Sequence, residues 1–393
     1  MRRTPADVGA VVELAQELVR RPSRGGVDPY GPVLEVLEGW LGERGLPHRR
    51  LTSTDEQAVG VLVEVRGGRP GPWWVLDACV DTAPFGDTGR WSFSPTSGEV
   101  RDGWLLGRGA ADSKLAAALF CHLAADLAPR AEEFAGGLAV LLDVDEHTGG
   151  FGGARAYLAD PRTPKPAGVL IGYPGLDEVV VGGRGLWRAT LTVYGEAGHS
   201  GARRTAVGAI GRAAHLVGLL DAAELPGPDR DSGFPLGPKL TVTSFHGGEG
   251  FSVTPDRVDV NVDVRTTPEF GAGAAAGLVR REVAALDAVR PGPRPTGIAE
   301  VTDWPAYRLD AGRQPAAALL GAARDAGLVV RAKTAGPSNI GNLLAGAGIP
   351  ATAGFGVPYE GLHGIDERAS LAELPAVYAV YRRAVLGLLG AAD

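Results

Sequence analysis

The sequence predicts an α/β protein of two domains, one inserted into the other. Its 393 residues are more than a single ordinary core accommodates. Apolar strands alternate with helices toward both ends of the chain, which is typical of a mainly parallel sheet covered on both faces. The middle instead has the order β-α-β-β-α, which indicates a small inserted α+β sandwich. We place the larger domain at residues 1–183 and 297–393, and the insert at 184–296.

The helices and strands of the larger domain are predicted from hydrophobic periodicity and from the glycine and proline residues that mark their ends. Its first part has expected helices at 11–19 and 33–41, strands at 59–65 and 73–80, a turn at 107–112 opening a helix to about Leu127, and apolar strands at 138–144 and 169–174. Its last part has an expected helix at 314–326, a strand at 328–333 and a closing helix at 371–389.

The insert is predicted from a strand at 186–194 that alternates apolar and polar residues. A helix at 207–220, strands at 239–245 and 258–264, and a helix at 272–289 follow. A proline-rich segment at 290–295 then ends the insert in this interpretation.

Polar and aromatic residues follow the strands of the larger domain at the points where these strands end. They are Cys79, Asp112, Glu146, His147 and Tyr173. In open α/β sheets ligands bind at the carboxyl ends of strands, so these residues are expected to share one pocket.

The amino-acid composition limits the binding partners and the cellular environment that we expect. The net charge is −7 and basic residues are scattered, which gives no reason to expect nucleic acid or an anionic membrane. No apolar run of about 18 residues predicts a membrane span. The two cysteines, Cys79 and Cys121, form no CxxC pair, so a reducing, cytoplasmic environment is expected.

Several short motifs occur in a fixed order along the chain. They are Cys79-Val80-Asp81-Thr82-Ala83-Pro84, Gly107-Arg108-Gly109-Ala110-Ala111-Asp112-Ser113-Lys114, Asp145-Glu146-His147, Tyr173-Pro174, Gly195-Glu196-Ala197-Gly198-His199-Ser200, Gly336-Pro337-Ser338-Asn339 and Gly361-Leu362-His363-Gly364-Ile365-Asp366-Glu367. With them the chain resembles, over nearly its full length, the zinc-dependent aminoacylases, acetylornithine deacetylases, succinyl-diaminopimelate desuccinylases and glutamate carboxypeptidases. The resemblance implies a hydrolase-like three-layer α/β/α catalytic domain and a ferredoxin-like lid, through which a homodimer is expected.

The resemblance also implies a pair of zinc ions bridged by the aspartate that matches Asp112. One ion would also contact positions 79 and 173, and the other positions 147 and 363. Glu146 matches the general base, His199 the lid histidine that stabilises the oxyanion, and Arg265 a clamp for a substrate carboxylate. Asn339 lies in a turn that resembles the family's Gly-Thr-Ser-Asp-like turn, and we expect it to contact substrate.

Three of the five ligand positions depart from the family pattern. Cys79 stands for a histidine, His147 for a glutamate and Tyr173 for an acidic ligand. Asp112, His147 and His363 still make a credible set for one zinc ion, and their composition is also that of a non-haem iron triad. The other site would offer Cys79, Asp112 and a neutral phenol beside the negative charge of Asp81, so we expect it to be weak or empty.

Each altered residue has an alternative interpretation. Cys79 either faces the pocket or is a small buried apolar group, and Tyr173 either contacts substrate or fills the space of a lost ion. His147 is a ligand, a proton shuttle or a structural histidine. The first hypothesis for function is an amidohydrolase that acts on an N-acyl amino acid or small peptide-like amide with one metal ion. The second is a metal-free enzyme that uses Cys79, Glu146 and His147 for nucleophilic or proton-transfer chemistry. The third is a non-catalytic protein that binds an amino acid.

Overall fold

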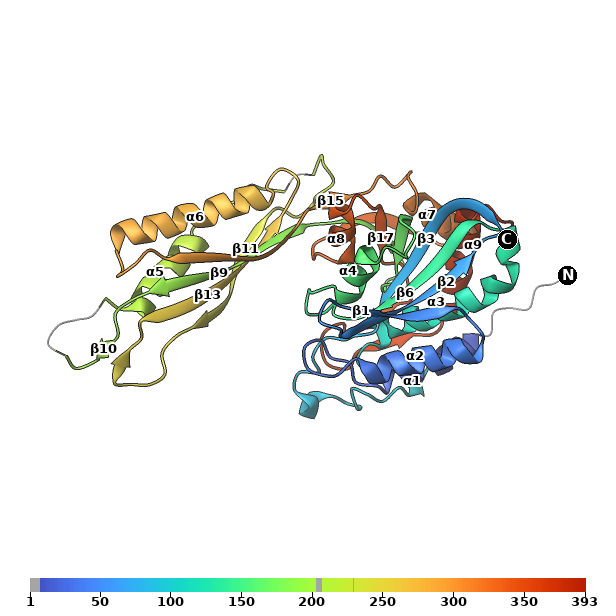
Figure 1. Ribbon diagram of the computed structural model, residues 1–393, viewed down its shortest axis with the longest axis horizontal. Helices are drawn as coiled ribbons and strands as arrows, with labels where there is room; N and C mark the ends of the chain where they lie inside the picture. The colour runs from blue at the N-terminus through green and yellow to red at the C-terminus, as the bar shows by residue number, and fades with distance from the viewer. Residues whose placement is uncertain (1–7, 203–206, 229) are drawn as a thin grey trace. The chain divides into compact units, whose positions relative to one another are not determined.

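The computed structural model describes residues 8–202, 207–228 and 230–393. The chain forms two compact units (Figure 1). The first extends to Val181 and resumes over Leu309–Lys333 and Asn339–Asp393, and the second comprises Gly182–Arg308 and Thr334–Ser338. The predicted class, an α/β/α domain with an inserted α+β domain, is confirmed.

A mixed sheet forms the centre of the first unit. Its strands, in spatial order, are β1 (His48–Thr52), β2 (Ala58–Arg66), β6 (Ala135–Asp143), β3 (Arg69–Cys79), β7 (Pro166–Ile171), β17 (Ala351–Ala353), β8 (Glu178–Gly183) and β15 (Tyr307–Arg308), and β16 (Arg331–Ala335) also pairs with β8. The strands β6, β3, β7 and β17 are parallel, whereas the pairs β1–β2, β2–β6 and β17–β8 are antiparallel. The strands β3 and β6 are buried over most of their length because helices cover both faces, which explains their continuous apolar sequences.

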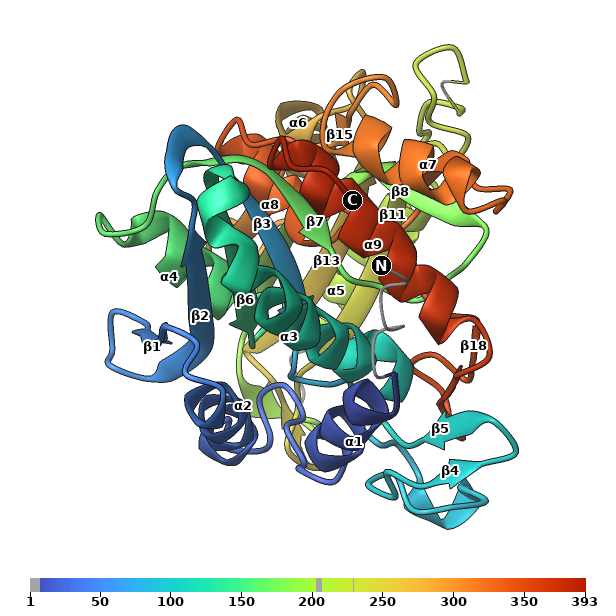
Figure 2. The same cartoon turned by 90° about the vertical axis from the view of Figure 1, so that its right-hand side faces the viewer.

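Helices pack on both faces of this sheet. They are α1 (Val8–Val19), α2 (Gly31–Glu43), α3 (Leu115–Leu127), α4 (Gly152–Ala159), α7 (Ala316–Asp325), α8 (Ile340–Gly346) and α9 (Leu374–Leu388), with 3-10 turns η1 (Thr88–Arg90) and η3 (Ala128–Glu133). The helices α3 and α9 lie over one face and α4 over the other (Figure 2). The indole of Trp74 in β3 donates to the carbonyl of Leu388, 3.0 Å away, which ties the sheet to α9. On the other face Gly153 of α4 lies so close to Asp143 that a Cβ atom there would be 2.3 Å from the aspartate Cβ.

A small antiparallel sheet joins two distant parts of the first unit. It consists of β18 (Tyr359–Glu360), β19 (Arg368–Ser370), β5 (Trp104–Leu106) and β4 (Val100–Arg101). The register pairs Arg368 with Leu106. The turn that follows β5 therefore lies beside the loop that precedes β19, and these two segments carry Asp112 and His363.

The second unit has ferredoxin-like order. It comprises β9 (Gly185–Tyr194), α5 (Ala209–Asp221), β11 (Lys239–His246), β13 (Arg257–Thr266), α6 (Ala272–Val289) and β14 (Gly297–Trp304), with short strands β10 (Gly198–His199), β12 (Val253–Thr254), β15 (Tyr307–Arg308) and β16 (Arg331–Ala335), the last of which crosses from the first unit. The main sheet has the order β11-β13-β9-β14 and is antiparallel throughout. Alternate residues of β9 and β13 form its core with both helices, which lie on one face (Figure 1).

The predicted boundary at residue 297 is wrong. Residues Gly297–Trp304 form β14 and pair with β9 inside the second unit. The proline-rich segment before them turns the chain from α6 into this strand, so it does not mark the end of the unit. Thr334–Ser338 also belong to the second unit, where Ser338 donates to the carbonyl of Arg184 and the Arg184 guanidinium donates to the carbonyl of Gly336.

In the part of the chain that the structure describes, no helix combines the length and the apolar character that crossing a membrane requires.

Candidate metal centre

The site lies in the first unit, where parallel strands β3 and β6 end. Cys79 is the last residue of β3 and pairs in register with Asp143, the last residue of β6. Glu146 and His147 follow in the loop after β6, and Asp81 follows β3. Parallel strands present their carboxyl ends at the same edge, and this places the four side chains Cys79, Asp81, Glu146 and His147 around one point.

Asp112 comes from the turn η2 (Ala110–Lys114) that precedes α3. The buried carboxylate of Glu367 accepts hydrogen bonds from the backbone N–H groups of Gly109, Ala111 and Asp112, at 2.9, 3.1 and 3.3 Å. Glu367 also forms a buried ion pair with Arg108. The turn is therefore fixed through its backbone by a residue that lies far along the chain.

The two carboxylate oxygens of Asp112 have different surroundings. Oδ2 lies 2.9 Å from Nε2 of His363 and 3.5 Å from Nε2 of His147. Oδ1 accepts a hydrogen bond of 2.8 Å from the Ser113 hydroxyl and lies 3.9 Å from Sγ of Cys79. Burial raises the pKa of Asp112, but the neighbouring imidazoles of His147 and His363 outweigh burial and hold that pKa below its usual range. Asp112 is therefore an ionised carboxylate whose Oδ2 faces both imidazoles.

His147 is an almost fully buried imidazole between two carboxylates. Its ring nitrogens are inaccessible to water, and neither makes a hydrogen bond of good geometry with a described residue. Nδ1 lies 3.5 Å from Oδ2 of Asp81, and Nε2 lies 3.5 Å from Oδ2 of Asp112. Burial lowers the pKa of His147, but its interactions with Asp112 and Asp81 outweigh burial and raise the pKa to about 11. A buried polar atom without a partner indicates a missing ligand, and here a cation fits.

Asp112, His147 and His363 fit one metal ion. One ligand atom from each lies within 4.8 Å of the others. A tetrahedral zinc ion with bonds of about 2.0–2.2 Å separates its ligand atoms by about 3.3 Å, and the distances of 2.9 and 3.5 Å at Oδ2 lie on either side of this value. One carboxylate and two imidazoles leave a fourth position for water, as in catalytic zinc sites.

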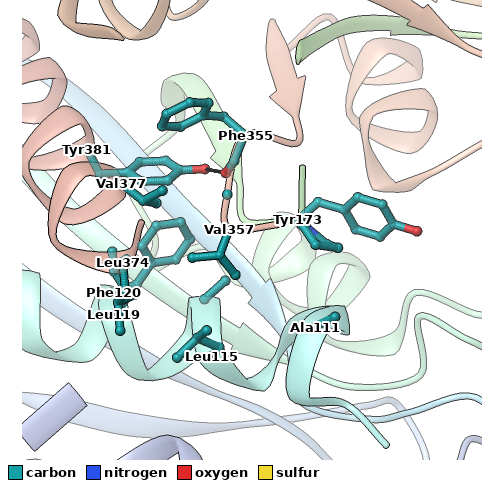
Figure 3. A pocket seen from close by; sticks show the side chains of 13 residues that line it. Ala111, Leu115, Leu119, Phe120, Tyr173, Phe355, Val357, Leu374, Val377 and Tyr381 are labelled. Carbon is teal, nitrogen blue, oxygen red and sulfur yellow. Dashed lines mark hydrogen bonds between the residues drawn. The ribbon is translucent and has the colours of Figure 1, made fainter. Parts of the chain in front are cut away.

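Tyr173, by contrast, is not suited to metal binding. Burial, followed by the negative charges of Asp112 and Glu146, raises the pKa of its phenol far above the usual value, so the hydroxyl stays neutral. The phenol points away from a small apolar cavity that the same residue borders (Figure 3). That cavity, of about 20 Å³, holds no more than a water molecule and is too small for a substrate group.

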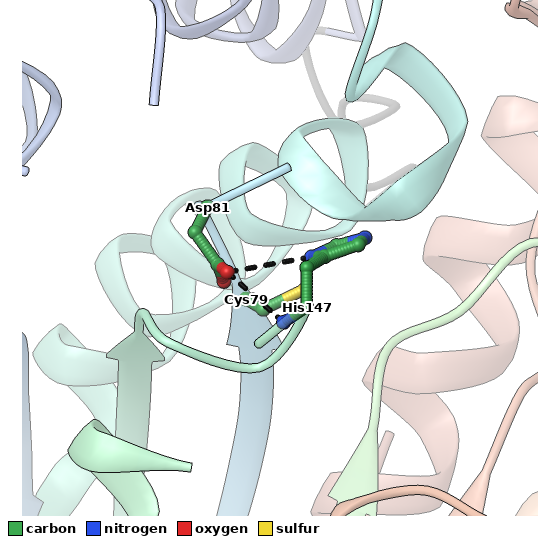
Figure 4. A group of neighbouring side chains, drawn as sticks. All are labelled: Cys79, Asp81 and His147. Atoms are coloured by element: carbon green, nitrogen blue, oxygen red, sulfur yellow. Dashed lines mark hydrogen bonds and ion pairs between the residues drawn. The ribbon is translucent and has the colours of Figure 1, made fainter. Parts of the chain in front are cut away.

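Cys79, Asp81 and His147 form a second close group (Figure 4), in which one ligand atom from each lies within 4.8 Å of the others. The Asp81 carboxylate faces both the backbone N–H and the ring of His147. Burial, followed by the charge of Asp112, raises the pKa of the Cys79 thiol well above its ordinary value. Because the thiolate is the form that attacks carbonyls, this shift disfavours Cys79 as a nucleophile at neutral pH, and a metal ion would have to displace its proton.

Glu146 is the remaining acidic group at the edge of the site. Its side chain is 24% exposed, and Oε2 lies 3.5 Å from Nδ1 of His147. Burial raises the pKa of Glu146 to about 7, while the neighbouring His147 opposes this shift. A carboxyl group with such a pKa exchanges protons readily at neutral pH.

Comparison with known proteins shows the family to which the chain belongs. The model of peptidase family M20/M25/M40 matches residues 76–387. The chain belongs to this family. A succinyl-diaminopimelate desuccinylase of Methylorubrum extorquens is 30% identical to this M20 protein, over 94% of the present chain and 96% of the relative.

Two solved structures share the fold. A tripeptidase from Staphylococcus aureus has a TM-score of 0.77 at 17% identity and covers 98% of this chain and 100% of its own. A dinuclear metal-binding peptidase of the M20 family from Bacillus subtilis has a TM-score of 0.70 at 16% identity, with 98% and 99% covered. The family predicted from the motifs is thus confirmed, and so is the class, a hydrolase that acts on amide bonds.

Three further residues of this M20 protein were predicted to act on substrate, and their local contacts differ. In the second unit His199 lies in β10, is exposed, and accepts a hydrogen bond from the Gly201 N–H at Nδ1. Arg265 of β13 pairs with Asp263 and donates to the Ser338 hydroxyl. In the first unit Asn339 caps α8 by accepting the Gly341 N–H at 2.8 Å. Their roles toward substrate stay predictions.

Sequence reasoning missed two groups of residues. Ser113 and Glu367 hold Asp112 in place, although both occur within the quoted motifs. Asp77 lies two residues before Cys79 in β3 and Asp143 lies beside Cys79 in β6; both are buried, with no hydrogen-bond partner for any carboxylate oxygen among the described residues. Both lie in strands whose other residues are mostly apolar. The only sign of them in the sequence was therefore a single acidic residue within each apolar run.

Proposed function

We propose that this M20 protein hydrolyses the amide bond of an N-acyl amino acid or small peptide-like amide with one zinc ion held by Asp112, His147 and His363. The observation that carries the proposal is the unequal use of the Asp112 carboxylate. Oδ2 faces two imidazoles, whereas the Ser113 hydroxyl occupies Oδ1, the oxygen that a second ion would need. The neighbours of Oδ1, a thiol and a neutral phenol, are poor ligands for such an ion.

The reaction assigns one task to each residue around the centre. Zinc supplies a Lewis acid that polarises a carbonyl and favours ionisation of water at neutral pH. Glu146 takes a proton from the attacking water and passes it to the leaving nitrogen, for which its pKa of about 7 is suited. Tyr173 serves as a neutral hydrogen-bond donor toward substrate. His199 as oxyanion donor, and Arg265 and Asn339 as substrate contacts, rest on the family resemblance.

The test uses zinc-loaded protein and a panel of amides. The panel contains N-succinyl-diaminopimelate, after the name of the relative, together with N-acetyl amino acids, dipeptides and tripeptides, and release of free amine is followed. We expect hydrolysis of at least one class, loss of activity on removal of zinc with a chelator, and recovery when zinc is returned. The Glu146→Gln variant is the matched control. Hydrolysis that persists in this variant, or after the metal is removed, would contradict the proposal.

A second candidate is metal-independent chemistry at Cys79. The observation that favours it is the group of Cys79, His147 and Asp81, which brings together the thiol, imidazole and carboxylate that a nucleophilic triad requires. The raised pKa of the thiol weighs against it. Activity that resists chelators and disappears in Cys79→Ser would establish this candidate in place of the zinc enzyme.

We further propose that the protein forms a homodimer through the second unit. β11 lies at the edge of its sheet and has a largely exposed burial pattern, with Phe245 40% exposed. An edge strand of this kind offers backbone groups for pairing with a second copy. Light scattering on a size-exclusion column should give twice the mass of the chain, and the Thr243→Pro variant, which disrupts the edge, should give the monomer.

A further inference from the structure

We propose that Asp81 is the positioning residue of the metal centre and that it orients His147, the residue that replaces the family's glutamate ligand. The inference rests on the proposed function, because it concerns the zinc site assigned there. In the motif of the family this aspartate follows a histidine at position 79, but here position 79 is a cysteine. In the structure the Asp81 carboxylate contacts His147.

The Asp81 carboxylate holds the backbone that carries His147. Oδ2 accepts the backbone N–H of His147 at 3.0 Å, and Oδ1 accepts that of Glu146 at 3.2 Å. The side chain of Asp81 is completely buried. A carboxylate with both oxygens tied to one loop has little freedom to move, so it fixes the position from which the imidazole projects.

The same carboxylate also selects the ring nitrogen that faces the metal. Oδ2 of Asp81 lies 3.5 Å from Nδ1 of His147, on the side of the ring away from Asp112. With a zinc ion bound, a proton on Nδ1 would face Asp81 and leave the lone pair of Nε2, the nitrogen 3.5 Å from Oδ2 of Asp112, to the ion. A histidine ligand whose other nitrogen donates to a carboxylate has a fixed tautomer and greater basicity.

Glu146 is the competing acceptor, since its Oε2 also lies 3.5 Å from Nδ1 of His147. Two differences favour Asp81 over Glu146 as the acceptor for Nδ1 of His147. The Glu146 side chain is 24% exposed and no hydrogen bond to its carboxylate is recorded among the described residues, whereas Asp81 is enclosed and tethered twice. Glu146 must also exchange a proton during turnover, and a base engaged permanently with His147 would be hindered in that exchange.

The experiment measures zinc affinity of the full chain by competition with a chromophoric chelator. Asp81→Asn should weaken zinc binding about 10–100-fold, the range typical for loss of an outer-shell carboxylate. Three variants serve as controls and should bind zinc like the wild type: Glu146→Gln removes the competing acceptor, Cys79→Ser the nearby thiol, and Asp77→Asn a buried carboxyl group in the strand that precedes Asp81. Cobalt-substituted Asp81→Asn should show altered visible bands, because the ring orientation changes.

A double-mutant cycle separates positioning from a general effect of charge or folding. In a His147→Gln background the added Asp81→Asn change should cause no further loss of zinc affinity, because its effect passes through the imidazole. A further 10–100-fold loss in that background would overturn the inference, as would unchanged affinity in Asp81→Asn alone. An equal loss in Cys79→Ser would show instead that Cys79 and Asp81 hold an ion themselves.

The cycle also distinguishes failure of this inference from failure of the proposed function. A wild-type protein that binds no zinc contradicts the proposed function and, with it, the role of Asp81. If the wild type and Asp81→Asn bind zinc equally tightly, the zinc site stands and only the role of Asp81 is overturned.

Discussion

Oδ2 of Asp112 lies 2.9 Å from Nε2 of His363, although 251 positions separate the two residues in the sequence. The pairing of β5 with β19 and the anchoring of the Asp112 turn by Glu367 bring them together. His363 adopts a left-handed backbone conformation with φ of 57°, which non-glycine residues rarely adopt and which functional sites often retain. The ligand set is thus held ready by contacts that do not involve a metal.

Zinc binding should tighten as the pH rises. In the metal-free protein the carboxylates of Asp112 and Asp81 outweigh burial and raise the pKa of His147 to about 11, so the ring is protonated at neutral pH. A metal binds only the neutral imidazole, so binding releases at least one proton. The zinc dissociation constant should therefore fall about tenfold per pH unit between about pH 6 and 8. Competition titrations at three pH values measure this, and a constant that does not change with pH would contradict it.

Glu146→Gln should lower kcat by about 10²–10⁴-fold, because the amide cannot accept the proton that the carboxylate takes. Glu146 is not needed to hold the ion, so the metal content of the variant should equal that of the wild type. The measurement pairs steady-state turnover of the best amide in the panel with elemental analysis of the same samples. If the metal were lost together with the activity, Glu146 would be a ligand and its assignment as base would be wrong.

Cys79→Ser should leave both turnover and metal content close to wild type. The thiol is protonated at neutral pH because burial and the charge of Asp112 raise its pKa, so neither activity nor metal binding depends on it. The variant should instead lose about 1–3 kcal/mol of stability, since a hydroxyl buried in that position needs a partner. Urea unfolding and turnover assays, run side by side, check both statements, and a loss of turnover in a folded variant would favour the metal-independent candidate.

Asp77→Asn should make the protein's stability less sensitive to pH. Burial, followed by the charge of Glu146, raises the pKa of Asp77 to about 8, against about 3.9 in an unfolded chain. Between these values the folded state binds more protons than the unfolded state, so stability falls as the pH rises from about 4 to about 8. An asparagine removes this contribution, and the variant should gain about 1–3 kcal/mol on the wild type between pH 5 and pH 8. Denaturant unfolding at several pH values tests this, and parallel curves for the two proteins would contradict it.

Periodicity in the sequence predicted the long elements and failed on the short ones. The strand at 73–80 and the helix at 272–289 appear as β3 and α6 because one has an unbroken apolar run and the other a long amphipathic repeat. The strands β17 and β19 have three residues each, and their pairing partners come from distant parts of the chain. Three residues are too few to show an alternation of apolar and polar side chains. Pairing between distant segments of the chain leaves no pattern in the local sequence.

The candidate site was predicted from the strand ends and the motifs, but its internal contacts were not. Strand-end positions indicated that Cys79, Glu146 and His147 would lie near Asp112, and they do. Side-chain rotamers decide which neighbour each oxygen of Asp112 faces. They also decide that the Asp81 carboxylate faces the ring of His147. Such choices are set by packing in three dimensions, which spacing along the chain does not encode.

The number of ions bound per chain tests the central claim most directly, because every role assigned above assumes a single ion at Asp112, His147 and His363. Protein purified without chelator, loaded with zinc and freed of excess metal would be measured by inductively coupled plasma mass spectrometry against protein concentration. The account predicts one zinc ion per chain. Two tightly held ions per chain, or none, would contradict it.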